Sequence, residues 1–210
     1  MRFDVKSNIG GDMKSLEIKQ IGAHNVKNAL AAVTVASLLD ISDDEISAGL
    51  LAFSPVKLRQ SIVSAKGFTV IEDCYNAGPE SMRAAIEVLA KLADKNHCHS
   101  IAVLGDMREL GDYSKQLHME IGTLVASRHI DYLVTFGREA ENIALGAINH
   151  AFKPDNISIN TNIEAPAAAA KVVFELAKHG DAVLFKASRA VRLERVIEEF
   201  KKLLDTKQPG

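Results

Sequence analysis

The stretch FTVIEDCYNAGPESM, residues 68–82, decides the fold class. Its first residues, Phe68 to Glu72, form a short apolar run that is typical of a buried strand. Pro79 suits the first turn of a helix, which we expect to continue to about Leu92. A strand that runs through a polar turn into a helix is the first half of a β–α–β unit.

Four more strand and helix units follow this one along the chain. Their spacing predicts a Rossmann-like α/β domain with a mostly parallel sheet, because short continuous apolar strands separated by helices are typical of sheets covered on both faces. The predicted strands are 100–104, 132–136, 157–160 and 182–185, and the predicted helices lie near 113–128, 138–149, 165–178 and 190–204.

The residues before this domain follow a different pattern. Residues 1–21 contain two alternating apolar runs around Asn8-Ile9-Gly10-Gly11, which predicts an antiparallel strand pair. Apolar residues then recur at helical spacing from Asn25 to Leu39. Ser42 and Glu45 predict a capping box that opens a second helix, which Pro55 ends. The change of pattern there predicts a domain boundary.

Composition limits the kinds of partner. The 25 Lys and Arg residues nearly balance the 27 Asp and Glu residues, so no basic or acidic excess favours nucleic acid or anionic lipid. We therefore expect small molecules or proteins as partners. We also expect no membrane insertion, because the sequence has no run of about 18 uncharged apolar residues. Cys74 and Cys98 have no metal-ligand spacing, and two cysteines in this length indicate reduced thiols, hence a cytoplasmic location. The N-terminal residues contain no apolar stretch typical of a signal peptide.

Polar residues gather where the predicted strands end. Ligands of open parallel sheets bind beyond the carboxyl ends of the strands, so these segments are the first candidates for a site. Taken singly, each segment also suits a turn or the start of a helix. Together they supply carboxylates, an amide and three cations, which suits a polyanionic ligand that carries amine or hydroxyl groups. The segments are 73–82, 105–111 and 186–189.

These segments, with two others, resemble the Mur ligase family. The family patterns are G-x-HN-x-x-N, D-x-YNANP-x-SM, LGDM-x-ELG and KGSR. The matching positions here are 22–32, 73–82, 104–111 and 186–189, together with Arg59 and His118, in that order along the chain. The runs are most similar to the branch that joins D-alanyl-D-alanine to UDP-N-acetylmuramoyl-tripeptide, which implies these two substrates, ATP and Mg2+.

The resemblance also implies roles for single residues. Asn25 and Asn28 resemble the pair that holds the adenine of ATP, although polar residues at a helix start are an alternative explanation. Asp73 resembles the acid that accepts from the ribose, although it could instead cap the following helix. His118 could equally be a packing residue. Implied roles are nucleotide binding for Asn25, Asn28, Arg59 and Asp73, catalysis for Lys186 and Arg189, and substrate binding for Asn76, Asp106, Glu109, His118 and Ser188.

The chain departs from the family patterns at several points. Gly78 replaces the second Asn of YNANP, Ala187 replaces the Gly of KGSR, and Lys57-Leu58-Arg59 replaces a Gly-Arg pair. No G-x-x-x-x-G-K-[ST] loop occurs, so nothing in the sequence cradles the β- and γ-phosphates of ATP. In the family that loop and the metal ligands precede the region matched here.

Two interpretations of the whole chain follow. In the first, residues 1–56 are the C-terminal remnant of the central ATP-binding domain and residues 57–210 are the C-terminal domain of a ligase that forms an amide through an acyl phosphate. In the second, the chain is a non-catalytic nucleotide- or protein-binding module derived from such a domain. The sequence predicts neither the oligomeric state nor the diamino acid of the tripeptide.

Overall fold

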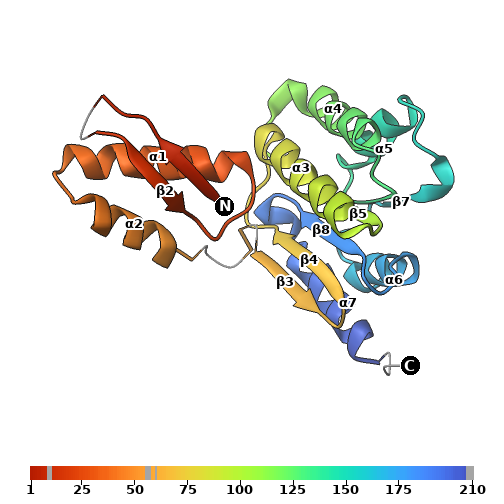
Figure 1. Ribbon diagram of the computed structural model, residues 1–210. Coiled ribbons are helices and arrows are strands. Elements are labelled where there is room, and N and C mark those ends of the chain that lie inside the picture. Colours follow the sequence, from red (N-terminus) through yellow and green to blue (C-terminus); the bar gives the residue numbers. More distant parts are fainter. Residues whose placement is uncertain (9–10, 55–57, 60, 207–210) are drawn as a thin grey trace. The chain divides into compact units, whose positions relative to one another are not determined.

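The computed structural model describes residues 1–8, 11–54, 58–59 and 61–206. The chain divides into two compact units, residues 1–56 and residues 57–210 (Figure 1). The predicted helix stop at Pro55 and the middle of the predicted turn, Ile9-Gly10, lie outside the described residues.

The first unit pairs a two-stranded antiparallel sheet with two helices. Strand β1, Arg2–Val5, pairs with β2, Met13–Glu17, as the alternating pattern predicted. Helix α1 spans Ala23–Leu38 and α2 spans Asp43–Ala52. The capping box at α2 is confirmed, because the Glu45 N–H donates to Ser42 Oγ and the Ser42 N–H donates to Glu45 Oε2. The Ser42 hydroxyl and, to a lesser extent, the Ser42 N–H donate to Glu45 Oε2, and these two hydrogen bonds lower the pKa of Glu45.

The first unit buries few of its apolar side chains. Its core contains Val5, Met13, Leu16, Val33 and Ile46. Many other large apolar side chains of this unit are exposed: Met1, Ile21, Leu30, Val35, Leu38, Leu39, Ile41, Leu51 and Phe53. Exposed apolar surface of this extent normally marks an interaction surface.

The second unit is built on a six-stranded sheet with strand order β3-β4-β8-β5-β6-β7. The edge strand β3 runs antiparallel to β4, and the other neighbours are parallel, as predicted for a Rossmann-like domain. The bounds are β3 Ser61–Ala65, β4 Phe68–Asp73, β5 Ser100–Gly105, β6 Tyr132–Phe136, β7 Ile157–Asn160 and β8 Ala182–Lys186.

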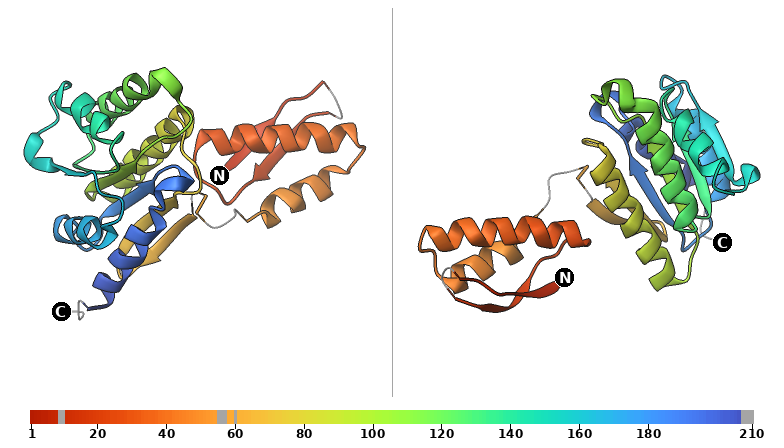
Figure 2. Two further views of the ribbon diagram at one scale, coloured as in Figure 1. Left: turned by 180° about the vertical axis from the view of Figure 1, so that it is seen from behind. Right: turned by 90° about the horizontal axis from the view of Figure 1, so that it is seen from above.

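Helices cover both faces of this sheet, as predicted (Figure 2). Strand β5 divides its side chains between them: Ala102 and Leu104 contribute to the core with α3, α4 and α5, while Ile101 and Val103 contribute to the core with α6 and α7. The bounds are α3 Pro79–Asn96, α4 Ser114–Ser127, α5 Glu141–Ile148, α6 Pro166–Leu176 and α7 Glu194–Thr206. Short 3-10 turns lie at Gly111–Tyr113, Pro154–Asn156 and Arg189–Val191.

Strand β3 was not predicted from the sequence. It forms a hairpin with β4 through Lys66 and Gly67, whose φ angles are 49° and 87°. Two consecutive residues at positive φ match the twist of a tight hairpin, and glycine adopts this conformation at little cost. Among the described residues, no helix is long and apolar enough to cross a membrane.

We predict that the two units differ in resistance to protease. Residues 57–210 contain two large buried cores, whereas the first unit has one small core and exposed apolar side chains, so its backbone should open more readily. Limited proteolysis followed by mass spectrometry should remove residues 1–55 first and leave the second unit. A stable product that begins near Met1 and has lost α6 and α7 would contradict this.

Candidate nucleotide and substrate site at the sheet rim

The three polar segments meet at one rim of the sheet in the second unit. Strand β8 lies between β4 and β5, so Lys186 is in register with Asp73 on one side and with Leu104 on the other. The strand that comes last in the sequence therefore brings the two earlier segments together. This confirms the expectation that all three segments share the carboxyl edge of the parallel strands.

A buried ion pair joins the ends of β4 and β8. Lys186 Nζ lies 2.7 Å from Asp73 Oδ2 and donates a second hydrogen bond of 3.1 Å to the carbonyl oxygen of Asn76. The Lys186 side chain is only 1% exposed. An ammonium group at this depth requires a charge partner, because removing it from water costs several kcal/mol. In this structure Lys186 therefore orders the loop that follows β4.

Asp106 holds the loop after β5. Its Oδ1 accepts from the Ala140 N–H at 2.9 Å, and its Oδ2 lies 3.1 Å from the Arg108 guanidinium. The close approach depends on Gly137, which has a φ of 121° and where a Cβ would lie 2.2 Å from Asp106 Oδ1. Asp106 is itself buried, so Arg108 is the exposed member of this pair. Sequence analysis missed Gly137, although a glycine directly after an apolar strand was a visible signal.

Ser188 contacts both of these loops. Its Oγ donates to the Ala77 carbonyl at 3.1 Å and accepts from the Arg108 N–H at 2.9 Å. Its backbone N–H donates to the Asp106 carbonyl at 3.0 Å. Ala187, the residue before Ser188, does not have a positive φ, so the glycine of the family pattern is not required for the backbone conformation at this position. A Cβ added at Gly105 would lie 2.7 Å from the Ala187 methyl group.

His118 is fully buried in α4 and has both ring nitrogens bonded to the backbone. Nε2 accepts from the Met107 N–H at 3.0 Å, and Nδ1 lies 2.7 Å from the Ser114 carbonyl. A ring with Nδ1 protonated and Nε2 free to accept satisfies both contacts. Of the two explanations that the sequence left open, the packing role describes this arrangement.

Arg59 stacks on an aromatic ring at the start of the second unit. Its guanidinium carbon lies 4.2 Å from the centroid of the Tyr75 ring, within the range of a cation–π contact. The Tyr75 N–H also donates to the Leu58 carbonyl at 3.1 Å. The segment before β3 is thus attached to the loop after β4, and Tyr75 is a further residue that sequence analysis did not select.

The other predicted rim residues remain accessible. Arg189 is 57% exposed and pairs at 2.6 Å with Glu194, whose second oxygen is buried without a partner among the described residues. Asn76 is exposed, and its Oδ1 accepts from the Ala77 N–H. Glu109 is exposed at a φ of 65°, which is uncommon for a residue other than glycine.

Asn25 and Asn28 belong to the first unit and lie three residues apart in the first turns of α1, hence on one face of that helix. The N-cap of α1 is Gly22, and Asn25 Nδ2 donates to the Ile21 carbonyl at 2.9 Å. Asn28 is exposed. Their proposed contact with adenine stays a prediction.

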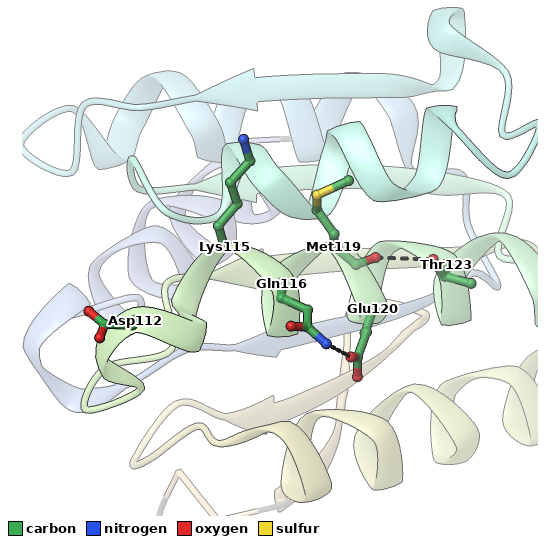
Figure 3. A pocket seen from close by; sticks show the side chains of 6 residues that line it. All are labelled: Asp112, Lys115, Gln116, Met119, Glu120 and Thr123. Atoms are coloured by element: carbon green, nitrogen blue, oxygen red, sulfur yellow. Dashed lines mark hydrogen bonds between the residues drawn. The ribbon is translucent and has the colours of Figure 1, made fainter.

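The described part of the chain offers no group of three or more His, Cys, Asp or Glu side chains suited to a metal ion. A shallow hollow lies along α4 and is lined by Asp112, Lys115, Gln116, Met119, Glu120 and Thr123 (Figure 3). None of the predicted site residues lines it. The polar rim, with its paired charges, is therefore the stronger candidate.

A parallel sheet covered on both faces, with paired charges at the carboxyl ends of its strands, defines a Rossmann-like ligand-binding domain. The family model for the Mur ligase, glutamate ligase domain matches residues 58–189. The chain belongs to the Mur ligase family.

Its relatives include the UDP-N-acetylmuramoyl-tripeptide--D-alanyl-D-alanine ligases of Bacillus subtilis and Mycobacterium leprae. The first is 35% identical over 91% of this chain and 41% of the relative, and the second is 37% identical over 85% and 37%. The crystal structure of the MurF ligase from Thermotoga maritima in complex with ADP is 32% identical, with a TM-score of 0.74 over 92% of this chain and 40% of that one. MurF from Acinetobacter baumannii is 28% identical, with a TM-score of 0.81 over 96% and 42%. The chain thus spans about two fifths of these relatives' length.

We predict that Asp73→Asn has two separable effects. It leaves the buried Lys186 ammonium without a charge partner, which should destabilise the fold by about 3–5 kcal/mol. The capping contacts at the start of α3 come from Ser81 and Gly78, so loss of a helix cap is not the expected cause. If Asp73 also accepts from the ribose, a ligase that contains this chain should show a Michaelis constant for ATP that rises more than kcat falls.

The measurements are thermal melting of the 210-residue chain and, in a ligase that contains this chain, steady-state kinetics of Asp73→Asn, with Lys186→Met as the matched variant. Lys186→Met removes the other member of the pair and leaves the carboxylate. A lower melting temperature with an unchanged Michaelis constant for ATP would leave Asp73 a structural role only.

Proposed function

We propose that this chain serves as the C-terminal part of an ATP-dependent ligase that adds D-alanyl-D-alanine to UDP-N-acetylmuramoyl-tripeptide in peptidoglycan precursor synthesis. The observation that carries the proposal is the rim itself: three loops that resemble the family motifs lie side by side and are joined by a buried ion pair and a shared hydroxyl. The names of the relatives at 35% and 37% identity support the choice of substrates.

In the proposed reaction, the terminal carboxylate of the tripeptide attacks the γ-phosphorus of ATP, and ADP leaves. The free amine of D-alanyl-D-alanine then attacks the acyl carbon, loses a proton, and phosphate departs as the amide forms. Charge develops on phosphoryl and oxyanion oxygens, so preorganised cations nearby stabilise the transition state. Arg189, which is accessible at the rim, is the proposed stabiliser.

In this proposal, some rim residues bind the nucleotide and others bind the peptide substrates. Asp73 accepts from the ribose while Lys186, 2.7 Å away, holds its carboxylate in place. Arg59, held on Tyr75, reaches the nucleotide. Exposed Asn76 and Glu109 offer an amide and a carboxylate to the peptide substrates, and a carboxylate suits the incoming ammonium group.

ATP would supply the phosphoryl group, with Asn25 and Asn28 on α1 proposed to hold its adenine. The chain has no G-x-x-x-x-G-K-[ST] loop, and its described residues do not group as metal ligands. We therefore propose that the phosphate cradle and the Mg2+ ligands belong to other parts of the enzyme. Phosphoryl transfer requires both.

The same proposal assigns the two units. Residues 1–56 would close the central ATP-binding domain, which accounts for their exposed apolar side chains, and residues 57–210 would form the C-terminal domain. We also propose a cytoplasmic location, because Cys74 and Cys98 are free thiols, which a reducing compartment preserves. No nucleic acid partner is proposed, given the near balance of charge.

We predict that the 210-residue chain alone forms no amide and binds ATP weakly. It lacks the charge-assisted hydrogen bonds to the phosphates, and two such bonds at about 1.5 kcal/mol each would account for about a hundred-fold in affinity. The experiment compares this chain with the longer product of its reading frame, using Mg-ATP, UDP-N-acetylmuramoyl-tripeptide and D-alanyl-D-alanine. Calorimetry measures binding, and mass spectrometry measures the product.

Amide formation by the longer protein only is the expected result. Turnover by the chain alone would show that the missing cradle is not required. A reading frame that starts at Met1 and yields a protein that binds a nucleotide or another protein without turnover would favour the non-catalytic module.

A further inference from the structure

We propose that Ser188 is a positioning residue that couples the nucleotide side of the rim to its substrate side, in place of the substrate contact that the family motif implied. This inference rests on the ligase function proposed above. Ser188 is 3% exposed, so its hydroxyl is directed into the chain and not toward a ligand.

Three segments far apart in the sequence depend on this one residue. The hydroxyl donates to the carbonyl of Ala77, after β4, and accepts from the N–H of Arg108, after β5. The backbone N–H of Ser188 donates to the carbonyl of Asp106, which adds a bond that does not depend on the side chain. The loop after β8 is thereby fixed to both of its neighbours.

Few side chains can make this connection. A hydroxyl presents a donor and an acceptor on a single small atom, which the buried space between the two loops requires. Alanine would leave the Ala77 carbonyl and the Arg108 N–H without their partner, and an unpaired buried polar group is costly. The loops would then be free to separate by small distances.

Such small distances matter for the proposed reaction. Ala77 ends the loop that begins with Asp73, on the proposed nucleotide side, whereas Arg108 lies between Asp106 and Glu109, on the proposed substrate side. The γ-phosphate must pass from one side to the other, and a misplacement of about 1 Å at a reacting centre costs about a hundred-fold in rate. Ser188 therefore fixes the distance between the loop on the nucleotide side, where the phosphoryl donor is proposed to bind, and the loop on the substrate side, where the acceptor is proposed to bind.

The test compares Ser188→Ala with Ser188→Thr, which keeps the hydroxyl, and with Ser100→Ala as a matched control. Ser100 is also 3% exposed, and its hydroxyl likewise donates once, to Asp131 Oδ2, and accepts once, from the Asp131 N–H. It lies at the start of β5, at the opposite end of that strand from the rim. Ser100→Ala therefore reproduces the loss of two hydrogen bonds without disturbing the rim loops.

The first readout is amide hydrogen exchange in the 210-residue chain, which requires no activity. In the wild type, the Arg108 N–H should be protected relative to that of its exposed neighbour Glu109. Ser188→Ala should speed exchange in residues 75–79 and 106–110 together, Ser188→Thr should restore protection, and Ser100→Ala should leave both loops unchanged. An Arg108 N–H that exchanges as fast as that of Glu109 in the wild type would overturn the inference.

The second readout is kinetics in the longer enzyme. Ser188→Ala should lower kcat/KM by about ten-fold for ATP and for D-alanyl-D-alanine alike, with recovery in Ser188→Thr. Ser100→Ala should reduce the melting temperature similarly with unchanged kinetics. An effect on one substrate only would indicate a direct contact and overturn the positioning role. A wild-type enzyme without activity would refute the proposed function, and the exchange experiment would still decide the coupling of the loops.

Discussion

The buried ion pair between Asp73 and Lys186 is the constraint on which the rim depends. The ammonium of Lys186 is almost fully enclosed, and two of its three protons go to Asp73 Oδ2 and to the Asn76 carbonyl. A charge enclosed in this way is stable only with its partners in place, so the end of β4 and the loop after it cannot move independently of β8. The other contacts at the rim depend on this fixed arrangement of the ends of β4 and β8.

The strand order explains why residues at the end of β8 contact loops that are distant in the sequence. Because β8 is inserted between β4 and β5, residues that follow it contact loops that precede it by about a hundred positions in the sequence, as the separations of 111 and 80 residues for the two Ser188 hydroxyl bonds illustrate. His118 on α4 accepts from the Met107 N–H, and Asp106 accepts from the Ala140 N–H before α5, so both residues support the loop after β5. A rim that must align a nucleotide with a second substrate gains preorganisation from these connections.

The sequence predicted most of the fold and the membership of the rim. Apolar periodicity gave the five parallel strands and their helices, and Ser42 with Glu45 gave the start of α2, because these signals are local. Strand β3 was missed because none of its residues is fully buried and its pairing depends on a tight turn at Lys66-Gly67.

The roles of the rim residues were harder to predict because they arise from long-range contacts. The sequence of a motif does not reveal whether its lysine side chain faces a ligand or an internal carboxylate. Only the register of β4 with β8 shows that Lys186 is enclosed beside Asp73. The same holds for the buried hydroxyl of Ser188 and the ring of His118. Arg59, Asn76, Glu109 and Arg189 remain accessible, so their proposed ligand contacts stay open to experiment.

The most direct test of this account is a double-mutant cycle on Asp73 and Lys186, measured by denaturant unfolding of the 210-residue chain with Asp73→Asn, Lys186→Met and the double variant. If the pair constrains the rim, each single change leaves a buried group unpaired, and the double variant should lose about 2 kcal/mol less than the sum of the single losses. The exposed pair Lys171 and Glu175 serves as the control and should show no measurable coupling. Losses at Asp73 and Lys186 that add to within about 0.5 kcal/mol would contradict the central role of the pair.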